Sequence, residues 1–263
     1  MQSTHCGPVL REWRQRRHMS QLALALKADV SQRHLSFVES GRAKPSREFV
    51  LHIAEQLELP LRERNRLLLA AGYAPVFPER SLHDPALAVA RDAIERVLQG
   101  HEPFPALAID RHWTLLLANR PVYALMSGIA PHLLDPPVNV VRLTLHPDGL
   151  APRILNWTQW RAHILERIAH AAELSADQML SELVTELRAY PPPRTSRPEN
   201  LTTIPEGGDV FVPLQLASDA GVLSFMSTTT VFGTPVDVTL SEIALECFFP
   251  ADAATAERLR SFS

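Results

Sequence analysis

Residues 20–45 read SQLALALKADVSQRHLSFVESGRAKP, and this stretch decides the fold of the first part of the chain. Ser20 and Ser31 each precede an apolar run with helical spacing, which is the pattern of an N-cap residue that opens a helix. Gly41 follows the second run, where helices commonly end on a glycine. Asp29 and Val30 form the short turn between the runs. The stretch therefore predicts two helices, Gln21–Ala28 and Gln32–Ser40.

The second of these helices is predicted to leave one face outward, because Leu35 and Val38 face the core. In a DNA major groove an arginine reads guanine, a glutamine reads adenine, and an apolar tip contacts a thymine methyl. Gln21 starts a helix, where amide donors favour a phosphate. A merely solvated position is an equally good interpretation of His34. The predicted DNA contacts are Gln21, Gln32, Arg33, His34, Ser36, Phe37, Arg42 and Lys44, the last two on the DNA backbone.

Three further helices are predicted around this pair. One spans about Gly7–His18, a fourth runs from Pro45-Ser46 to about Leu57, and a fifth starts at Pro60 and ends before Gly72. The proline-containing stretch Tyr73–Pro85 is interpreted as a linker, and a helix over Ala86–Leu98 follows it. The predicted organisation is a helical DNA-binding domain at 1–74, a linker with a connecting helix at 75–105, and a second domain at 106–263.

Charge is distributed unevenly along the chain. Of its 263 residues, 1–80 carry 13 Arg/Lys and 8 Asp/Glu, whereas 81–263 carry 13 and 21, within a net charge of −3. A basic first part and an acidic second part suggest that only the first part meets a polyanion. The start of the chain lacks the apolar core of a secretory signal, and Cys6 and Cys247 give no paired framework. We therefore expect a cytoplasmic chain without a membrane segment.

The second part alternates between strand and helix patterns. A hairpin is predicted from Ala106–Ile109 and Trp113–Ala118, and a helix opens at Asn119 or Pro121. Two longer helices follow, and the first carries an apolar stripe from Trp157 to Ala171. The second is predicted to start at Ser175, with Gln178 three residues later as in a capping box, and to face the core with Met179, Leu183, Leu187 and Tyr190. Strands return at Val210–Leu216, Gly221–Thr230 and Val236–Phe249. This order predicts an α+β domain with helices packed on one side of a sheet.

The first part resembles the lambda-repressor-like helix-turn-helix family, also called the XRE family. The resemblance rests on Gln21-x-x-Leu24-Ala25-x4-Val30-Ser31-x3-Leu35-Ser36-x-x-Glu39-x-Gly41. It implies a partly buried salt bridge between Arg14 and Glu39 that joins the first and third helices. Many members have glycine in the turn where this chain has Asp29, which tolerates a left-handed backbone better than most residues. A module that has lost DNA binding and serves only protein contacts is the alternative.

Most of residues 8–250 resemble XRE regulators with an MmyB-like ligand-binding domain. The segments that carry this likeness are VSQRHLSFVESGRAKPSREFVLHIAEQLELPLRERNRLLLAAGYAP, ALAIDRHWTLLLANRPVYALM, VNVVRLTLHPDGLAPRILNW, LVTELRAYP and GVLSFMSTTTVFGTPVDVTLSEIALECFFP. The resemblance implies a PAS-like fold with a small-molecule pocket, and long-chain fatty acids or similar amphipathic molecules as its ligand class. It also implies a sequence-specific transcriptional regulator.

Several residues of the second part are compatible with such a pocket. Apolar and aromatic side chains could line it, and Arg153 or Arg142 could bind a carboxylate through two hydrogen bonds. The alternative is that the aromatic residues are ordinary core and that the arginines are solvated. The predicted ligand contacts are Trp113, Leu115, Leu117, Tyr123, Met126, Arg153, Trp157, Phe211 and Phe225.

No catalytic or metal-binding motif stands out in the sequence. His146-Pro147-Asp148-Gly149 is interpreted as a turn, and no His-x-x-x-His, CxxC, phosphate loop or Gly-x-Ser-x-Gly is present. We therefore expect no enzyme, metal or cofactor, but a homodimer that binds a partly palindromic double-stranded operator and a small-molecule effector. Two alternatives stay open, namely a second domain that serves protein interaction or dimerisation, and an enzyme with a DNA-binding head.

Overall fold

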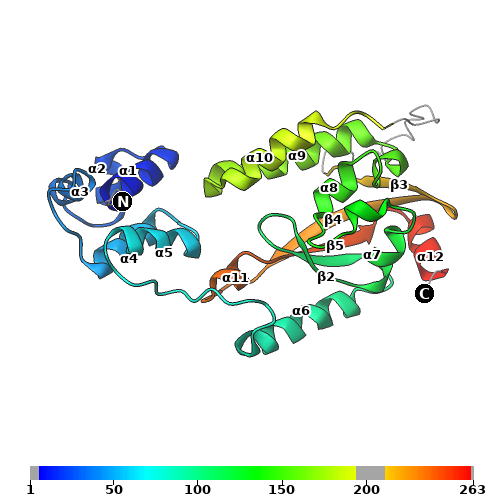
Figure 1. Cartoon of the computed structure of the whole chain (residues 1–263), viewed down its shortest axis with the longest axis horizontal. Helices are drawn as coiled ribbons and strands as arrows, with labels where there is room; N and C mark the ends of the chain where they lie inside the picture. Colours follow the sequence, from blue (N-terminus) through cyan, green and yellow to red (C-terminus); the bar gives the residue numbers. More distant parts are fainter. Residues whose placement is uncertain (1–5, 194–210, 262–263) are drawn as a thin grey trace. The chain divides into compact units, whose positions relative to one another are not determined.

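The computed structural model describes residues 6–193 and 211–261 and divides the chain into two compact units (Figure 1). The helical unit comprises residues 1–81 together with 234–241. The sheet unit comprises residues 82–233 together with 242–263. The chain therefore passes from one unit to the other three times, which the sequence analysis did not anticipate.

Five helices build the first part of the helical unit, as predicted. They are α1 (Cys6–Arg16), α2 (Gln21–Lys27), α3 (Gln32–Glu39), α4 (Arg47–Gln56) and α5 (Leu61–Ala70). Ser20 and Ser31 cap α2 and α3, because their hydroxyl oxygens accept from the backbone N–H of Ala23 at 3.0 Å and of His34 at 3.4 Å. Asp29 has a φ of +50° and Gly41 a φ of +73°, so both adopt the left-handed backbone that the turn and the helix end require.

Close packing of α1 against the end of α3 explains a glycine in the first helix. A methyl group added to Gly7 would lie 2.5 Å from the carbonyl oxygen of Glu39 and 2.6 Å from that of Val38. Both are backbone atoms at the end of a buried helix, so they cannot move aside cheaply. The apolar core beneath includes Leu10, Leu24 and Leu35, which are buried.

Gly7→Ala is expected to lower the free energy of unfolding of the helical unit by about 1–3 kcal/mol, because the two helices must separate to admit the methyl group. Urea titration of the full chain, followed by hydrogen exchange of each unit, measures the effect. Gly100→Ala is the matched control, since nothing lies within 4 Å of its added carbon. A Gly7→Ala protein as stable as the control would contradict the close packing.

The sheet unit is built on five antiparallel strands. These are β1 (Ala106–Ile109), β2 (Leu115–Ala118), β3 (Leu214–Ser218), β4 (Gly221–Val231) and β5 (Ala244–Pro250). Their order is β2-β1-β5-β4-β3, so β5 lies at the centre and is paired with both β1 and β4. The three strands that come late in the sequence, β3, β4 and β5, thus complete a sheet that the hairpin of β1 and β2 begins.

Helices cover both sides of this sheet. Figure 1 shows α8 (Val140–Leu145), α9 (Trp157–Ser175) and α10 (Gln178–Ala189) on one side and α6 (Ala88–Gly100) on the other. The prediction of helices on one side alone was therefore wrong. The remaining elements are η1 (Pro85–Leu87), α7 (Arg120–Leu125), η2 (Pro131–Leu133), η3 (Ala151–Arg153) and α12 (Ala253–Ser261).

Two predicted elements of the sheet unit need correction. The residue that caps α10 is Asp177 and not Ser175, because α9 continues to Ser175 and ends on Ala176 with a φ of +57°. The register of α10 shifts accordingly, so that Met179 is 59% exposed and Leu180 and Val184 are buried beside Leu183 and Leu187.

The last predicted strand, Val236–Phe249, is interrupted. A short helix, α11 (Val238–Ser241), occupies its first part and belongs to the helical unit, while β5 starts at Ala244. Asp237 causes the interruption, because its carboxylate accepts from the backbone N–H of Thr239 at 2.9 Å and so opens the helical turn. Val210, where another strand was predicted to start, lies outside the described residues.

Candidate nucleic-acid interface and ligand cavity

The outward face of α3 is organised around the ring of Phe37. The guanidinium carbon of Arg33 lies 5.3 Å from the centre of this ring, and that of Arg42 lies 6.0 Å from it. Cation–π contacts of this kind hold the two arginines beside the apolar ring. Gln32 is exposed at the start of the same helix, and Ser36 is half-buried. Five of the predicted DNA contacts, Gln32, Arg33, His34, Ser36 and Phe37, therefore lie on α3, and two cations lie close to the ring of Phe37.

Three of the predicted contacts have partners elsewhere in the helical unit. The ring of His34 packs edge-on against Phe49, with 4.9 Å between the ring centres. Lys44 extends its amine over Tyr73, 5.8 Å from the ring centre. Gln21 donates from Nε2 to Oε2 of Glu39 at 2.8 Å, so its side chain supports α3. These supporting roles cannot be separated from outward ones in the sequence, because the partners lie in other helices or in the segment that follows them.

The predicted salt bridge between Arg14 and Glu39 is confirmed. Arg14 donates from Nε to Oε1 of Glu39 at 2.6 Å and from Nη2 to Oε2 at 2.9 Å. A third bond runs from Arg14 Nη1 to the carbonyl oxygen of Met19 at 2.7 Å. The hydrogen bonds that Arg14 donates to Glu39 raise the pKa of Arg14. These contacts fix α1, the start of α2 and the end of α3 to one another.

The charge of the segment from α3 to α4 follows from this salt bridge. Residues 31–47 contain a single carboxylate, that of Glu39, which is buried and paired with Arg14. The cations Arg33, Arg42 and Lys44 are exposed. A surface that presents cations and hides its one carboxylate suits the phosphate backbone of DNA.

A cavity of about 810 Å³ lies within the sheet unit. Leu125 of α7, Leu223 of β4 and Leu259 of α12 contribute apolar lining. Arg153, Arg120, Glu102 and Asp219 supply its charged groups. The cavity is therefore largely apolar with a few ionic groups, which is the usual make-up of a small-molecule site.

Arg153 is the predicted ligand contact that lines this cavity. Its guanidinium donates to the carbonyl oxygens of Leu125 at 2.8 Å and Ala217 at 3.3 Å, and no partner of its Nη2 is found among the described residues. Burial lowers the pKa of Arg153, whereas the charge of Asp219 raises it. An arginine nevertheless stays protonated, so Arg153 brings a positive charge and an unused donor to a lining that also includes Arg120 and the carboxylates of Glu102 and Asp219.

Arg142, the alternative to Arg153, is already paired. It donates from Nε to Oε1 of Glu186 at 2.8 Å and from Nη2 to Oε2 at 2.7 Å. This is the two-bond arrangement that a ligand carboxylate would need, so Glu186 occupies the place of the ligand. The structure thus favours Arg153 among the two arginines.

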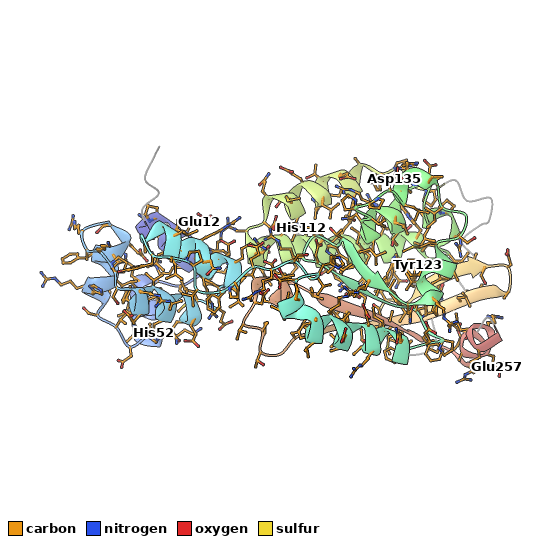
Figure 2. The ribbon with its side chains drawn as sticks, turned by 60° about the horizontal axis from the view of Figure 1, so that its bottom comes forward. Glu12, His52, His112, Tyr123, Asp135 and Glu257 are labelled. Atoms are coloured by element: carbon orange, nitrogen blue, oxygen red, sulfur yellow. The ribbon has the colours of Figure 1, made fainter. Side chains whose placement is uncertain are left out.

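The other eight predicted ligand contacts are not among the lining residues of this cavity. Tyr123 of α7, which Figure 2 labels, is 57% exposed, Phe211 is 39% exposed, and Phe225 is buried in the sheet. Trp113 has a φ of +66°, precedes β2 and lies beneath the guanidinium of Arg167 at 5.0 Å. Those that are half-buried in the core or at its edge are Leu115, Leu117, Met126 and Trp157.

Lining residues such as Ala217 and Leu223 were missed by the sequence analysis. They belong to the hairpin of β3 and β4, which lies about 100 residues after α7 in the chain. Their apolar pattern marks a strand but carries no signal of what the strand faces. These lining residues could be predicted only if the contact between that hairpin and α7 were known.

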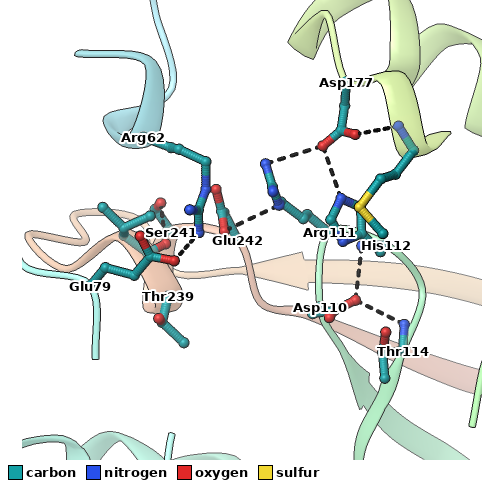
Figure 3. Close-up of polar contacts among 12 residues, drawn as sticks. Arg62, Glu79, Asp110, Arg111, His112, Thr114, Asp177, Thr239, Ser241 and Glu242 are labelled. Atoms are coloured by element: carbon teal, nitrogen blue, oxygen red, sulfur yellow. Dashed lines mark hydrogen bonds and ion pairs between the residues drawn. The ribbon is translucent and has the colours of Figure 1, made fainter. Parts of the chain in front are cut away.

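A polar cluster holds the turn between β1 and β2 (Figure 3). Asp110 accepts from the backbone N–H of His112 and of Thr114, both at 2.8 Å, which confirms the predicted hairpin. Arg111 and His112 reach Asp177 at 3.1 and 2.9 Å. Burial opposes ionisation of Asp177, but the hydrogen bond from His112 and the charge of Arg111 outweigh it and lower the pKa of this carboxyl.

One group of possible metal ligands occurs among the described residues. His132, His146 and Asp148 bring their ligand atoms within 4.8 Å of one another. However, Nδ1 of His146 accepts from the backbone N–H of Asp148 at 3.0 Å, which closes the turn predicted at this position. That ring nitrogen is thereby engaged within the turn, and His132 was not singled out from the sequence.

Comparison with protein families agrees with these two sites. The model of the MmyB-like transcription regulator ligand binding domain matches residues 90–262, and a helix-turn-helix model matches residues 10–64. No curated protein matches the chain. Throughout the residues that the structure describes, none of the helices combines the length and the apolar character that crossing a membrane requires.

Proposed function

The chain belongs to the MmyB-like transcription regulators, DNA-binding proteins with a ligand-binding domain, and from that premise we propose that an acidic amphipathic molecule held at Arg153 controls its binding to an operator. The molecule is a long-chain fatty acid or a compound of similar shape. The regulator acts as a cytoplasmic homodimer. The observation that carries the proposal is a largely apolar cavity in which Nη2 of Arg153 has no hydrogen-bond partner among the described residues.

The proposed DNA contacts start from the exposed face of α3. Arg33 and Arg42 flank Phe37 there, and a recognition helix places such residues against base edges and phosphates. One helix-turn-helix contacts a half-site alone, so two copies are needed for an operator of two half-sites. Size measurement of the complex on duplexes with one and two half-sites tests this stoichiometry.

Arg33→Ala is expected to weaken operator binding by about 1–3 kcal/mol and to relax the preference at one base pair. The operator is a duplex selected from a random-sequence pool by the wild-type protein, and fluorescence anisotropy at fixed salt gives the affinities. Arg66→Ala is the control, because this arginine lies on α5 and pairs with Glu63 at 2.8 Å. Equal affinity of Arg33→Ala and wild type would show that the reading face is assigned wrongly.

The proposed ligand follows from the cavity's size and chemistry. Pockets for small molecules commonly measure roughly 300–1,000 Å³, and the cavity of about 810 Å³ falls within that range. Leu125, Leu223 and Leu259 provide apolar wall for a hydrocarbon chain. Arg153 is held by backbone carbonyls and keeps Nη2 for a carboxylate. The PAS-like description of this unit stays a prediction, which the five-stranded antiparallel sheet supports.

Native mass spectrometry of the purified full chain, followed by organic extraction, tests the ligand class. We expect a bound fatty acid in the wild-type protein, or uptake of added palmitate. Arg153→Gln is expected to weaken palmitate binding at least tenfold, because a charge-assisted pair in a partly buried site is lost. Arg142→Gln is the matched control, since Arg142 is engaged by Glu186. Equal losses in both variants would remove Arg153 from its proposed role.

A further inference from the structure

Part of the connection between β4 and β5 belongs to the helical unit, although both strands belong to the sheet unit. We call this part, residues 234–241, the inserted segment. Residues 234–241 group with residues 1–81, while β4 before them and β5 after them group with the sheet unit. The backbone N–H of Val238 donates to the carbonyl oxygen of Pro78 at 2.8 Å, and Val238 is fully buried. The segment is thus held in the helical unit by a backbone hydrogen bond and by an apolar anchor.

Polar side chains strengthen this attachment. Arg80 pairs with Asp237 at 3.0 Å, and the side chain of Asp237 is only 3% exposed. The hydroxyl of Thr239 donates to the carbonyl oxygen of Arg80 at 2.5 Å. A buried carboxylate that both caps α11 and pairs with an arginine is costly to detach, so the segment moves with the helical unit.

Within the sheet unit, β4 precedes this segment and β5 follows it. The two strands pair along most of their length, and β4 continues to the cavity wall. Pairs between β4 and β5 run from Val231 and Ala244 to Phe225 and Pro250. Leu223 of the same β4 lines the cavity, and β4 also pairs with β3, whose Ala217 accepts from Arg153. A change at the cavity wall that displaces β4 therefore displaces Val231, the end of the strand, which residues 232 and 233 connect to the inserted segment.

The return of the chain into β5 is fixed as well. Glu242, the first residue after the inserted segment, pairs with Arg111 at 3.6 Å (Figure 3). Arg111 also pairs with Asp177, the residue that caps α10. The return into β5 is thus tied to the β1–β2 turn by an ion pair, whereas residues 232–236 at the other end lie outside helices and strands.

We propose that the β4–β5 connection transmits the state of the cavity to the DNA-binding helices. The proposal rests on the proposed function, because it needs a ligand in the cavity and DNA on α3. Covalent continuity supplies the link, since the inserted segment is fixed to the helical unit and its flanking strands are fixed in the sheet. Two sites coupled in this way change each other's affinity by the same factor.

The first test compares operator affinity with and without palmitate in the full chain. We expect a roughly 5- to 150-fold change in the wild-type protein, the usual range of such coupling. In Asp237→Ala/Thr239→Val the change should fall to less than about twofold, while palmitate affinity and palmitate-free operator affinity stay near wild type. Asp135→Ala, an exposed aspartate of another loop, is the control. An unaltered ratio in the double variant overturns the proposal.

Thr239→Val alone is the milder variant, since it removes one hydrogen bond and leaves the buried Asp237 in place. It replaces the double variant if that protein does not fold. We expect its ratio of operator affinities with and without palmitate to lie between those of the wild type and the double variant.

A second measurement needs no ligand. Operator binding should slow hydrogen exchange in residues 222–231 and 244–250 of the wild-type chain and leave them unchanged in the variants. Unchanged exchange in wild-type protein saturated with operator contradicts the transmission route itself. A wild-type protein whose strands respond to DNA but which takes up no palmitate contradicts the proposed ligand and supports the route.

Discussion

Glu39→Ala is expected to lower the free energy of unfolding of the helical unit by about 3–5 kcal/mol and to abolish operator binding with it. The side chains of Glu39 and Arg14 are 2% and 9% exposed, so truncation leaves a buried guanidinium without its carboxylate. Arg14 would retain the carbonyl oxygen of Met19, but Gln21 would also lose its acceptor. The loss therefore exceeds that of a single hydrogen bond.

Urea unfolding of the full chain, resolved by hydrogen exchange of peptides from each unit, measures this change. Glu12→Ala is the matched control, because Glu12 is 61% exposed and pairs with Arg16 across one helical turn. That substitution should cost less than about 1 kcal/mol. Replacing both partners, as in Arg14→Met/Glu39→Leu, should recover a good part of the loss. A Glu39→Ala protein no less stable than the control would mean that the ion pair does not hold the helices together.

The helical unit was predictable because its signals are local. Ser20 and Ser31 cap helices that start at the next residue, and Asp29 and Gly41 adopt the left-handed backbone at the positions where helices end. Each signal acts within four residues, so the sequence alone places it. The Arg14–Glu39 pair spans 25 residues and came from the family resemblance, which supplied the distant contact.

The sheet unit shows where local signals stop. Ser175 with Gln178 satisfies a capping pattern, yet Asp177 caps the helix because the preceding helix continues through Ser175. The cavity is lined by residues of α7, β3 and β4. Apolar periodicity predicts these elements one by one but does not predict which of them pack together. Arg153 and Arg142 were alternatives in the sequence because either guanidinium can bind a carboxylate through two hydrogen bonds, and of the two only Arg153 lines the cavity. Phe225 was predicted to line the cavity as an aromatic residue, with ordinary core as the alternative, and it is buried in the core.

Arg167→Met is expected to lower the free energy of unfolding of the sheet unit by about 3–5 kcal/mol, because it leaves a carboxylate buried and unpaired. Arg167 of α9 donates to Oε1 of Glu246 at 2.7 Å, and Glu246 lies on the central strand β5 with a side chain that is 5% exposed. Thr229 of β4 donates to the same oxygen at 2.8 Å, but one hydroxyl does not replace a charge. The substitution also removes the guanidinium above Trp113.

Removing the charge of Glu246 instead should lower the free energy of unfolding by less than removing Arg167. The difference between the two variants is a sharper test than either variant alone. In Glu246→Gln the unpaired group is Arg167, whose side chain is 28% exposed and can be hydrated. Hydrogen exchange in urea should therefore give the sheet unit of Arg167→Met a lower free energy of unfolding than that of Glu246→Gln. The helical unit of each variant, which neither substitution touches, is the reference. Arg142→Met, which breaks the exposed pair with Glu186, is the control and should cost less than about 1 kcal/mol. Equal stabilities of Arg167→Met and this control would mean that water reaches Glu246, and β5 would then be fixed to α9 by apolar packing alone.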